Sequence, residues 1–432
     1  MGTRVRRGRI AVLVVSALVV TACGKGAQPG QTTAGASGSS STGPGATGGA
    51  NKATGPGVSA TAITVGNVST VGGPVPGLFK GAQVGVQAYF DYVNSTGGVH
   101  GRQLTMQAGD DQFSCTKNSS ATASLLPNVI AFVGNYSLFD NCGGLQIPTT
   151  VANVSVSLNT SVTARPNTFS AQPSVPGWAD GDLLYFKQHY PQAVQHVGAL
   201  VGSIPSAEAS WTYEQHAMLV DGYHISVVDQ YPVLQASFTA DVIRFQQAGV
   251  QMVVMDQADP ASIARFVDAM QLQNYHPTIV ESGGVAYTGS FIKQAGVSAA
   301  ETLISAQHQA LYLGSDAKSV PEVTTFDDWV QKADPGFTPD IFTLFGWASA
   351  MLFVQALQSA GQNPTRASLL AQLAKITTFD AGGLLAPADP ANKTPSICYI
   401  LAKVVNGQWE RVDSPPSGFI CTGHFITYPN GK

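Results

Sequence analysis

Apolar residues follow two alternating patterns along the first half of the chain. Continuous apolar runs, as at residues 129–133, are typical of parallel strands that are covered on both faces. Between such runs, apolar residues recur every three or four positions, as at residues 78–93, which indicates amphipathic helices. Three more segments predict strands: residues 63–68, 103–108 and 147–156. Strands that alternate with helices predict an α/β fold built on a parallel sheet.

The alternation starts again in the second half of the chain. Three short apolar runs predict its strands: residues 197–201, 252–255 and 278–280. Residues 342–357 are apolar nearly all round a helix, so this helix should be buried. Residues 398–405 and 408–412 flank Asn406-Gly407, a dipeptide that favours a β-hairpin. About 370 residues follow position 60, more than one ordinary core holds, so we predict two lobes.

The first 60 residues have a different pattern. Arginines at positions 4, 6, 7 and 9 precede an apolar run over residues 10–22, which is shorter than the ~20 residues needed to cross a bilayer. This pattern is typical of a secretory signal, which we place at residues 1–22. The run ends in Val20-Thr21-Ala22-Cys23, which resembles a bacterial lipobox, so we predict lipidation of Cys23. Ordinary signal cleavage with an unmodified Cys23 is the alternative.

Residues 23–60 are rich in Gly, Ser, Thr, Ala and Pro. They contain too few apolar side chains to offset the entropy of ordering, which predicts a flexible linker between a lipid anchor and the lobes. Together with the signal, this linker predicts a protein anchored to the cell membrane on its extracytoplasmic face.

Composition and cysteine usage narrow the function. A net charge of −4 gives no basic footprint for nucleic acid. Apart from Cys23, four cysteines allow three pairings, of which sequence proximity favours Cys115–Cys142 and Cys398–Cys421. No C-x-x-C, H-E-x-x-H, G-x-S-x-G or P-loop motif is present, so we expect no metal, no cofactor and no enzymatic activity.

Two segments carry a resemblance to a known family. The turn Gly97-Gly98-Val99-His100-Gly101-Arg102 precedes a strand that ends in Asp110-Asp111. Residues 236–240, Ala-Ser-Phe-Thr-Ala, precede a helix and the strand at residues 249–254. Both segments resemble the leucine/isoleucine/valine-binding proteins, which are type I periplasmic-binding receptors of ABC importers. The placement of Cys115 and Cys142 is also similar to a disulfide in that family.

The resemblance implies a fold and a function. The fold is two doubly wound parallel-sheet lobes with a central cleft and a hinge. Lobe 1 would hold residues 61–175 and 310–382, and lobe 2 residues 176–309 and 383–432. The function is that of a monomeric extracytoplasmic lipoprotein that binds a small polar solute, such as an amino acid. Cleft closure would deliver this solute to an ABC permease. A lipoprotein that senses a solute and signals to a membrane partner without transport is the alternative.

Polar residues that follow the predicted strands are the candidate ligand contacts, because ligands of open parallel sheets bind beyond the carboxyl ends of the strands. The set is Ser69, Thr70, Asn135, Tyr136, Ser137, Ser157, Asn159, Ser203, Asp256, Glu281 and Ser282. For each Ser, Thr or Asn, a role in a turn or helix cap is the alternative.

The resemblance assigns roles within this set. The first-lobe residues would bind the carboxylate of an amino acid, and an acid in the loop at residues 281–284 would bind its ammonium. The family's acid aligns with Gly283, whereas this chain has Glu281 and Asp256 nearby. This shift leaves a polar or amide-like solute open.

Overall fold

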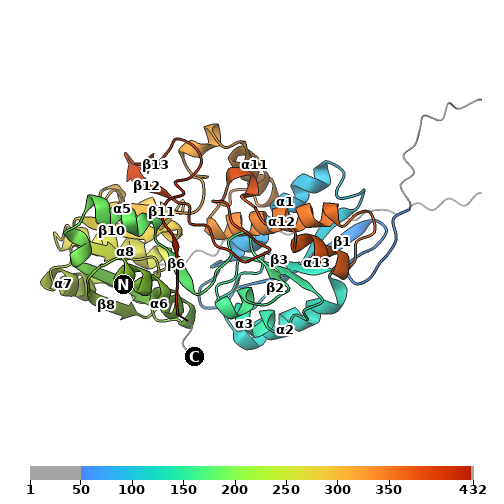
Figure 1. Ribbon diagram of the computed structural model, residues 1–432, viewed down its shortest axis with the longest axis horizontal. Helices are drawn as coiled ribbons and strands as arrows, with labels where there is room; N and C mark the ends of the chain where they lie inside the picture. The colour runs from blue at the N-terminus through green and yellow to red at the C-terminus, as the bar shows by residue number, and fades with distance from the viewer. Residues whose placement is uncertain (1–49, 430–432) are drawn as a thin grey trace, which may run out of the picture. The chain divides into compact units, whose positions relative to one another are not determined.

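The computed structural model describes residues 50–429, which form an α/β fold on two main sheets (Figure 1). The predicted signal and the predicted lipidation of Cys23 lie outside the described residues. The first sheet has five parallel strands in the order β2-β1-β3-β4-β5. The strands are β1 (Ala62–Ser69), β2 (Gln103–Asp110), β3 (Ala131–Val133), β4 (Ala152–Val154) and β5 (Thr168–Phe169). We call this sheet and the helices that pack on it the first lobe.

Helices from two distant parts of the chain complete the first lobe. The early ones are α1 (Lys80–Ser95), α2 (Cys115–Leu125), α3 (Asp140–Gly144) and α4 (Thr160–Thr163). The late ones are α11 (Pro321–Ala333), α12 (Ile341–Ser359) and α13 (Arg366–Leu373). A Cβ atom on Gly85 would meet the carbonyl group of Thr343, and one on Gly346 would meet that of Ala82. Helices α1 and α12 therefore pack backbone against backbone.

Helix α12 is the buried helix that the sequence predicts. Among the described residues, it is the one helix long and apolar enough to span a membrane, but most of it is buried in the protein. Trp347 on this helix is fully buried and packs edge-on against Tyr89 and Phe326, with ring centroids 4.9 and 5.5 Å away. Its indole N–H donates to Glu322 Oε1 at 3.2 Å. This packing makes α12 a core helix of the first lobe.

The second sheet has seven strands in the order β13-β12-β11-β10-β9-β7-β8. Five are parallel: β7 (Val197–Gly202), β8 (Ile225–Tyr231), β9 (Met252–Val254), β10 (Ile279–Gly283) and β11 (Leu303–Gln307). The antiparallel pair β12 (Ile400–Val405) and β13 (Gln408–Val412) is the predicted hairpin. Its turn residues, Asn406 and Gly407, both have positive φ, as the predicted turn requires.

The helices that pack on the second sheet complete what we call the second lobe. They are α5 (Gly181–His189), α6 (Pro205–Val220), α7 (Thr239–Gln247), α8 (Pro260–Leu272), α9 (Phe291–Ala295) and α10 (Val297–Ala300). Short 3-10 turns lie at Leu126–Asn128, Ala193–Gln195, Gly284–Ala286, Ser315–Lys318 and Ala381–Gly383.

The chain passes between the two sheets three times: after β5, after β11 and before β12. The first passage contains β6 (Gly177–Ala179), which pairs antiparallel with β14 (Phe425–Thr427) near the end of the chain. Figure 1 shows this small sheet between the two lobes. The structure thus places the C-terminal segment, which has no counterpart in the sequence patterns, against β6.

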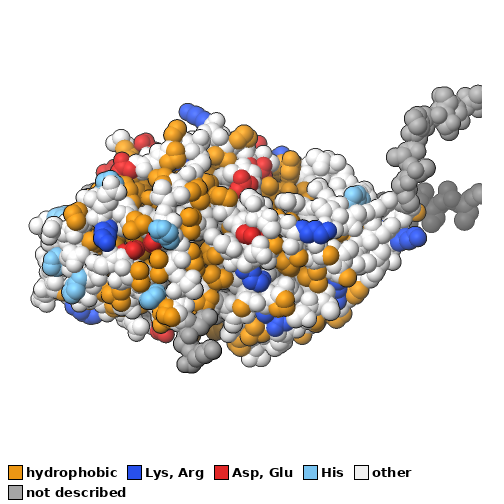
Figure 2. Space-filling model, viewed as in Figure 1, with side chains coloured by type: hydrophobic (Ala, Val, Ile, Leu, Met, Phe, Trp, Pro, Cys, Tyr) orange, Lys and Arg blue, Asp and Glu red, His pale blue; other side chains and the backbone are white. Residues whose placement is uncertain are grey.

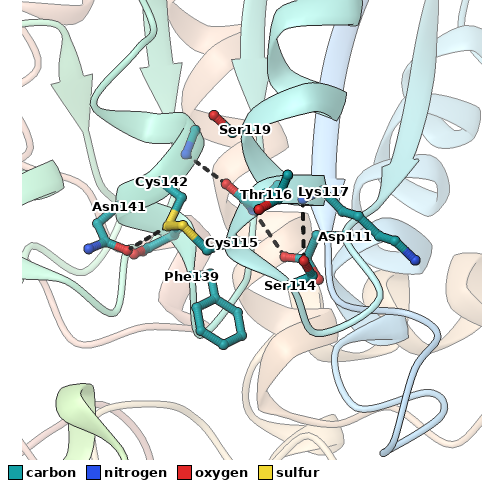
Figure 3. Close-up of a disulfide and its surroundings, with 12 residues drawn as sticks. Asp111, Ser114, Cys115, Thr116, Lys117, Ser119, Phe139, Asn141 and Cys142 are labelled. Carbon is teal, nitrogen blue, oxygen red and sulfur yellow. Dashed lines mark hydrogen bonds between the residues drawn. A yellow bond between two sulfur atoms is a disulfide. The ribbon is translucent and has the colours of Figure 1, made fainter.

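Both disulfides favoured by proximity are present. Cys115 at the start of α2 is bonded to Cys142 in α3, with 5.4 Å between Cα atoms (Figure 3). Cys398 before β12 is bonded to Cys421 in the C-terminal segment. The second bond ties that segment to the second lobe.

The end of the predicted linker is docked on the first lobe. Arg102 is fully buried and donates from Nε to the Ser59 carbonyl at 2.8 Å and from Nη2 to the Lys52 carbonyl at 3.0 Å. The backbone N–H of Lys52 donates to Asn363 Oδ1 at 2.9 Å. The folded part of the chain therefore begins before residue 61.

Candidate functional site

The first-lobe candidates cluster at the carboxyl edge of the first sheet. Ser69 ends β1, and its Oγ accepts from the backbone N–H of Tyr136 at 3.1 Å. The backbone N–H of Thr70 donates to the Tyr136 carbonyl at 3.1 Å. The loops after β1 and β3 therefore lie side by side, as neighbouring parallel strands require.

The hydroxyl groups of this edge are buried and bonded to one another. Ser69 Oγ donates to Asn67 Oδ1 at 2.7 Å, and Thr70 Oγ1 donates to Ser137 Oγ at 3.3 Å. Ser137 Oγ in turn donates to the carboxylate of Asp111. All three hydroxyl residues have no exposed surface. Their protons are used inside the protein.

The other first-lobe candidates also have internal partners. Asn135 accepts from the Val68 backbone N–H at 2.8 Å and donates to Asn153 Oδ1 at 3.1 Å. The side chain of Asn159 donates to the carboxylate of Asp140. Asn135 and Ser157 line a cavity of about 10 Å³, which holds no more than one water molecule. In this structure these side chains therefore make contacts within the protein, which agrees with the alternative that they stabilise turns and helix ends.

Aromatic rings surround the same edge. The Tyr136 ring lies 4.8 Å from that of Phe79 and 4.9 Å from that of Phe342, measured between centroids. Phe345 stacks on Tyr136 at 6.0 Å. Phe342 and Phe345 belong to α12 and are half-buried, so neither residue is fully covered by the protein. Sequence reasoning missed both residues because they lie more than 200 positions after the strands β1 and β3 whose loops they accompany.

The second-lobe candidates Asp256 and Glu281 lie on one face of the second sheet. Glu281 in β10 is in register with Val254 in β9, and Asp256 follows two residues later on the same face. A Cβ atom on Gly283 would lie 2.6 Å from Asp256 Oδ1, so the Asp256 carboxylate turns toward the end of β10. Glu281 is only 3% exposed, and its Oε1 has no hydrogen-bond partner among the described residues.

Two further carboxyl groups complete what we call the acidic cluster: Asp182, Glu214, Asp256 and Glu281. Glu214 lies on the buried side of α6, and its Oε2 accepts from Gln257 Nε2 at 2.8 Å. Sequence reasoning missed Asp182 and Glu214. A signal was available for Glu214, because it shares the buried face of α6 with Trp211, Ala217 and Met218.

Burial raises the pKa of every member of the acidic cluster. The pKa of Asp182 is raised to about 7, by burial first and by the Asp256 charge second. The pKa values of Glu214 and Glu281 are raised well above their usual range for the same two reasons. The nearby His308 has a pKa lowered by burial. Between the pKa values of the unfolded and the folded chain, these carboxyl groups therefore keep protons in the folded state that they lose in the unfolded state.

Because of these raised pKa values, we expect the free energy of unfolding to fall as pH rises from about 4 to about 7. The folded state binds more protons than the unfolded state over this range, and the stabilisation is fully present only below the unfolded pKa. Asp140 and Asp327, with pKa values raised by burial to about 6 and about 7, act in the same direction.

Urea unfolding at a series of pH values measures this slope. Asp182→Asn should flatten it, and Asp268→Asn on the exposed face of α8 should leave it unchanged. An Asp182→Asn slope equal to that of the unmodified chain would contradict the raised pKa of Asp182.

The last two candidates, Ser203 and Ser282, are not part of the acidic cluster. Ser203 has an exposed side chain, and its backbone N–H donates to the Tyr231 carbonyl at 2.8 Å. Ser282 is fully buried and donates to the Gly283 carbonyl at 3.2 Å.

Lysine and arginine side chains are scattered singly over the face in Figure 2, which shows no basic patch.

Two α/β lobes with mainly parallel sheets, joined by three chain passages, define the class of two-lobed solute-binding folds. A sequence model of the family described as "Periplasmic binding protein" matches residues 62–408, and the chain belongs to this family. The chain is 24% identical over 315 residues to Leu/Ile/Val-binding protein homolog 2 of Brucella abortus strain 2308. That match covers 68% of this chain and 78% of the relative.

Solved structures show the same type I periplasmic-binding fold. A fatty acid ABC transporter substrate-binding protein from Thermomonospora curvata has a TM-score of 0.70 at 17% identity, covering 85% of this chain and 94% of that one. A leucine-binding protein, LivK, from Thermotoga maritima has a TM-score of 0.64 at 15% identity, covering 85% and 99%. LivJ of Streptococcus pneumoniae, in complex with isoleucine, has a TM-score of 0.64 at 16% identity, covering 82% and 99%. The resemblance inferred from the sequence is confirmed.

Proposed function

We propose that this protein is an extracytoplasmic receptor that holds a small solute between its two lobes and delivers it to an ABC permease. One observation carries the proposal. Loops rich in polar and charged side chains follow the strands of both sheets, and residues 50–429 pass between the two lobes three times. In such folds, clefts between lobes are the usual ligand sites and close by hinge motion.

The membrane anchor belongs to the same proposal. Lipid on Cys23 would fix the chain to the membrane, and the residues up to Asn51 would span the distance to the first lobe. Asn51 donates from its side chain to the His100 carbonyl at 3.1 Å, so the tether would end on the turn that carries Arg102. Docking of a closed, monomeric receptor on a permease would complete the import cycle.

Ligand binding should stabilise the protein without chemical change to the ligand. We expect at least one class in a panel of small acids, amines, amides and amino acids to raise the melting temperature. At a hundredfold excess over Kd, stabilisation amounts to about 2.7 kcal/mol. Differential scanning fluorimetry measures the shift, and mass spectrometry of the recovered solute tests for turnover.

A matched pair of variants separates cleft binding from surface effects. Asp256→Asn should reduce the thermal shift, because Asp256 lies at the carboxyl edge of the second sheet. Asp268→Asn, on an exposed helix face, should leave the shift unchanged. A panel without any stabilising solute, or a solute recovered chemically altered, would refute the receptor proposal.

A further inference from the structure

The chemical class of the solute can be deduced from the charges and free hydrogen-bonding groups of the two lobes. In the first lobe, the hydroxyls that could receive a carboxylate are engaged. Ser69, Thr70 and Ser137 each donate their single proton to a protein acceptor. The backbone N–H groups of Val71 and Gly72 both donate to Asp110 Oδ1 at 3.0 Å.

The first-lobe edge also has the wrong charge for an anion. Asp111 is fully buried, and it accepts from Asn118 Nδ2 at 3.0 Å and from the Phe113 backbone N–H at 3.0 Å. Asp140 is 7% exposed, and Leu158 donates to it at 2.8 Å. Neither carboxylate takes part in any ion pair among residues 50–429. A ligand carboxylate here would meet two like charges in a desolvated place, which is strongly unfavourable.

In the second lobe, Glu281 takes part in no ion pair among residues 50–429. Glu281 is only 3% exposed, so water hardly reaches it, and its Oε1 has no hydrogen-bond donor among the described residues. Its neighbours in the acidic cluster are carboxyl groups, so it can share a hydrogen bond with Asp256 only when one of the two holds a proton. A buried carboxylate needs a cation or several donors. An ammonium group supplies both.

A metal ion does not fit this need. Among the described residues, no three His, Cys, Asp or Glu side chains are grouped closely enough to hold a metal. The half-buried side chains of Phe342 and Phe345, beside Tyr136 at the carboxyl edge of the first sheet, offer apolar contact and a π-face. Such surfaces suit the hydrocarbon part of an organic cation.

We propose that the solute is an organic amine without a carboxylate, whose ammonium group binds at Asp256 and Glu281 and whose hydrocarbon part packs on Phe342 and Phe345. This assignment rests on the receptor function proposed above. It differs from an amino-acid receptor because the first lobe binds no carboxylate.

Isothermal titration of the full chain at pH 7 with four matched probes tests the assignment. The probes are leucine, leucinamide, 3-methylbutylamine and 3-methylbutanoate, which share one branched hydrocarbon group. We expect the amine and the amide to bind at least tenfold more tightly than leucine. The carboxylate without an ammonium should not bind. A second series built on phenylethylamine, phenylalanine and 3-phenylpropanoate should give the same order.

Two isosteric variants locate the ammonium. Glu281→Gln and Asp256→Asn should each weaken amine binding at least tenfold, and Asp268→Asn should leave it unchanged. Far-UV circular dichroism verifies folding, and if one variant fails to fold the other carries the test. Unchanged amine affinity in a folded Glu281→Gln or Asp256→Asn protein overturns the assignment. Thermal stabilisation by Ca²⁺ or Mg²⁺ alone overturns it as well.

The outcomes separate this assignment from the receptor proposal. Leucine or 3-methylbutanoate binding as tightly as 3-methylbutylamine overturns the amine assignment and leaves the receptor function intact. No binding by any solute of the wider panel overturns both.

Discussion

Replacing Arg102 by methionine is expected to lower the free energy of unfolding by about 3 kcal/mol or more. The guanidinium group donates to the Ser59, Lys52 and Gln362 carbonyls and to Asn363 Oδ1 at 3.2 Å. These bonds join the segment before β1 to the loop between α12 and α13. Methionine keeps the apolar stem but removes this donor from the three carbonyls, and Asn363 Oδ1 keeps only the Lys52 N–H.

Urea unfolding monitored by circular dichroism measures the effect. Arg102→Lys should be nearly as harmful, because an ammonium cannot reach four acceptors in the planar geometry of the guanidinium. Lys117→Met, at an exposed position, is the control for loss of charge. Limited proteolysis should cut residues 50–59 faster in Arg102→Met than in the control. A loss of stability below about 1 kcal/mol would show that water replaces the guanidinium.

Breaking the ion pair between Arg411 and Asp316 is expected to lower the free energy of unfolding by about 3–5 kcal/mol. The side chains are only 6% and 1% exposed, and Arg411 Nη2 lies 2.6 Å from Asp316 Oδ2. Arg411→Met leaves the Asp316 carboxylate buried without its cation. The pair holds β13 to Ser315–Lys318, which follows the second passage between the sheets.

A double-mutant cycle measures the interaction. Arg411→Met with Asp316→Leu should be less destabilised than the two single changes added together, because no charge is then left buried. Arg244→Met is the matched control, since Arg244 is about half exposed in its pair with Asp229. We expect a loss of about 1 kcal/mol or less for Arg244→Met. Additive single changes would contradict a coupled buried pair.

The turn that contains Arg102 could be recognised from the sequence, but the contacts that Arg102 makes could not. The turn around it supported the family resemblance, but nothing in the turn indicates that its guanidinium clamps residues 52 and 363. Those partners are 50 and 261 positions away. Phe342 and Phe345 were not among the predicted site residues for a similar reason, because α12 lies far from β1 and β3 in the sequence.

Local patterns were sufficient for much of the fold. Hydrophobic periodicity predicted β1, β7 and α12 to within two residues at each end. The Asn406-Gly407 turn depends on neighbouring residues only, so it too followed from the sequence. Short chain separations likewise selected the two disulfides. These features are determined by residues within a few turns or a short loop of one another.

Only the tertiary structure decided what the polar side chains bind. The sequence placed Ser69, Ser137 and Glu281 at strand ends, but it could not show that Asp111 accepts the hydrogen bond of Ser137 or that the charges of Asp182 and Glu214 act on Glu281. Hydrogen bonds and burial depend on which distant segments the fold brings together. The sequence by itself therefore determined the class of fold, and long-range packing determined the charge and the free hydrogen-bonding groups that a solute would meet.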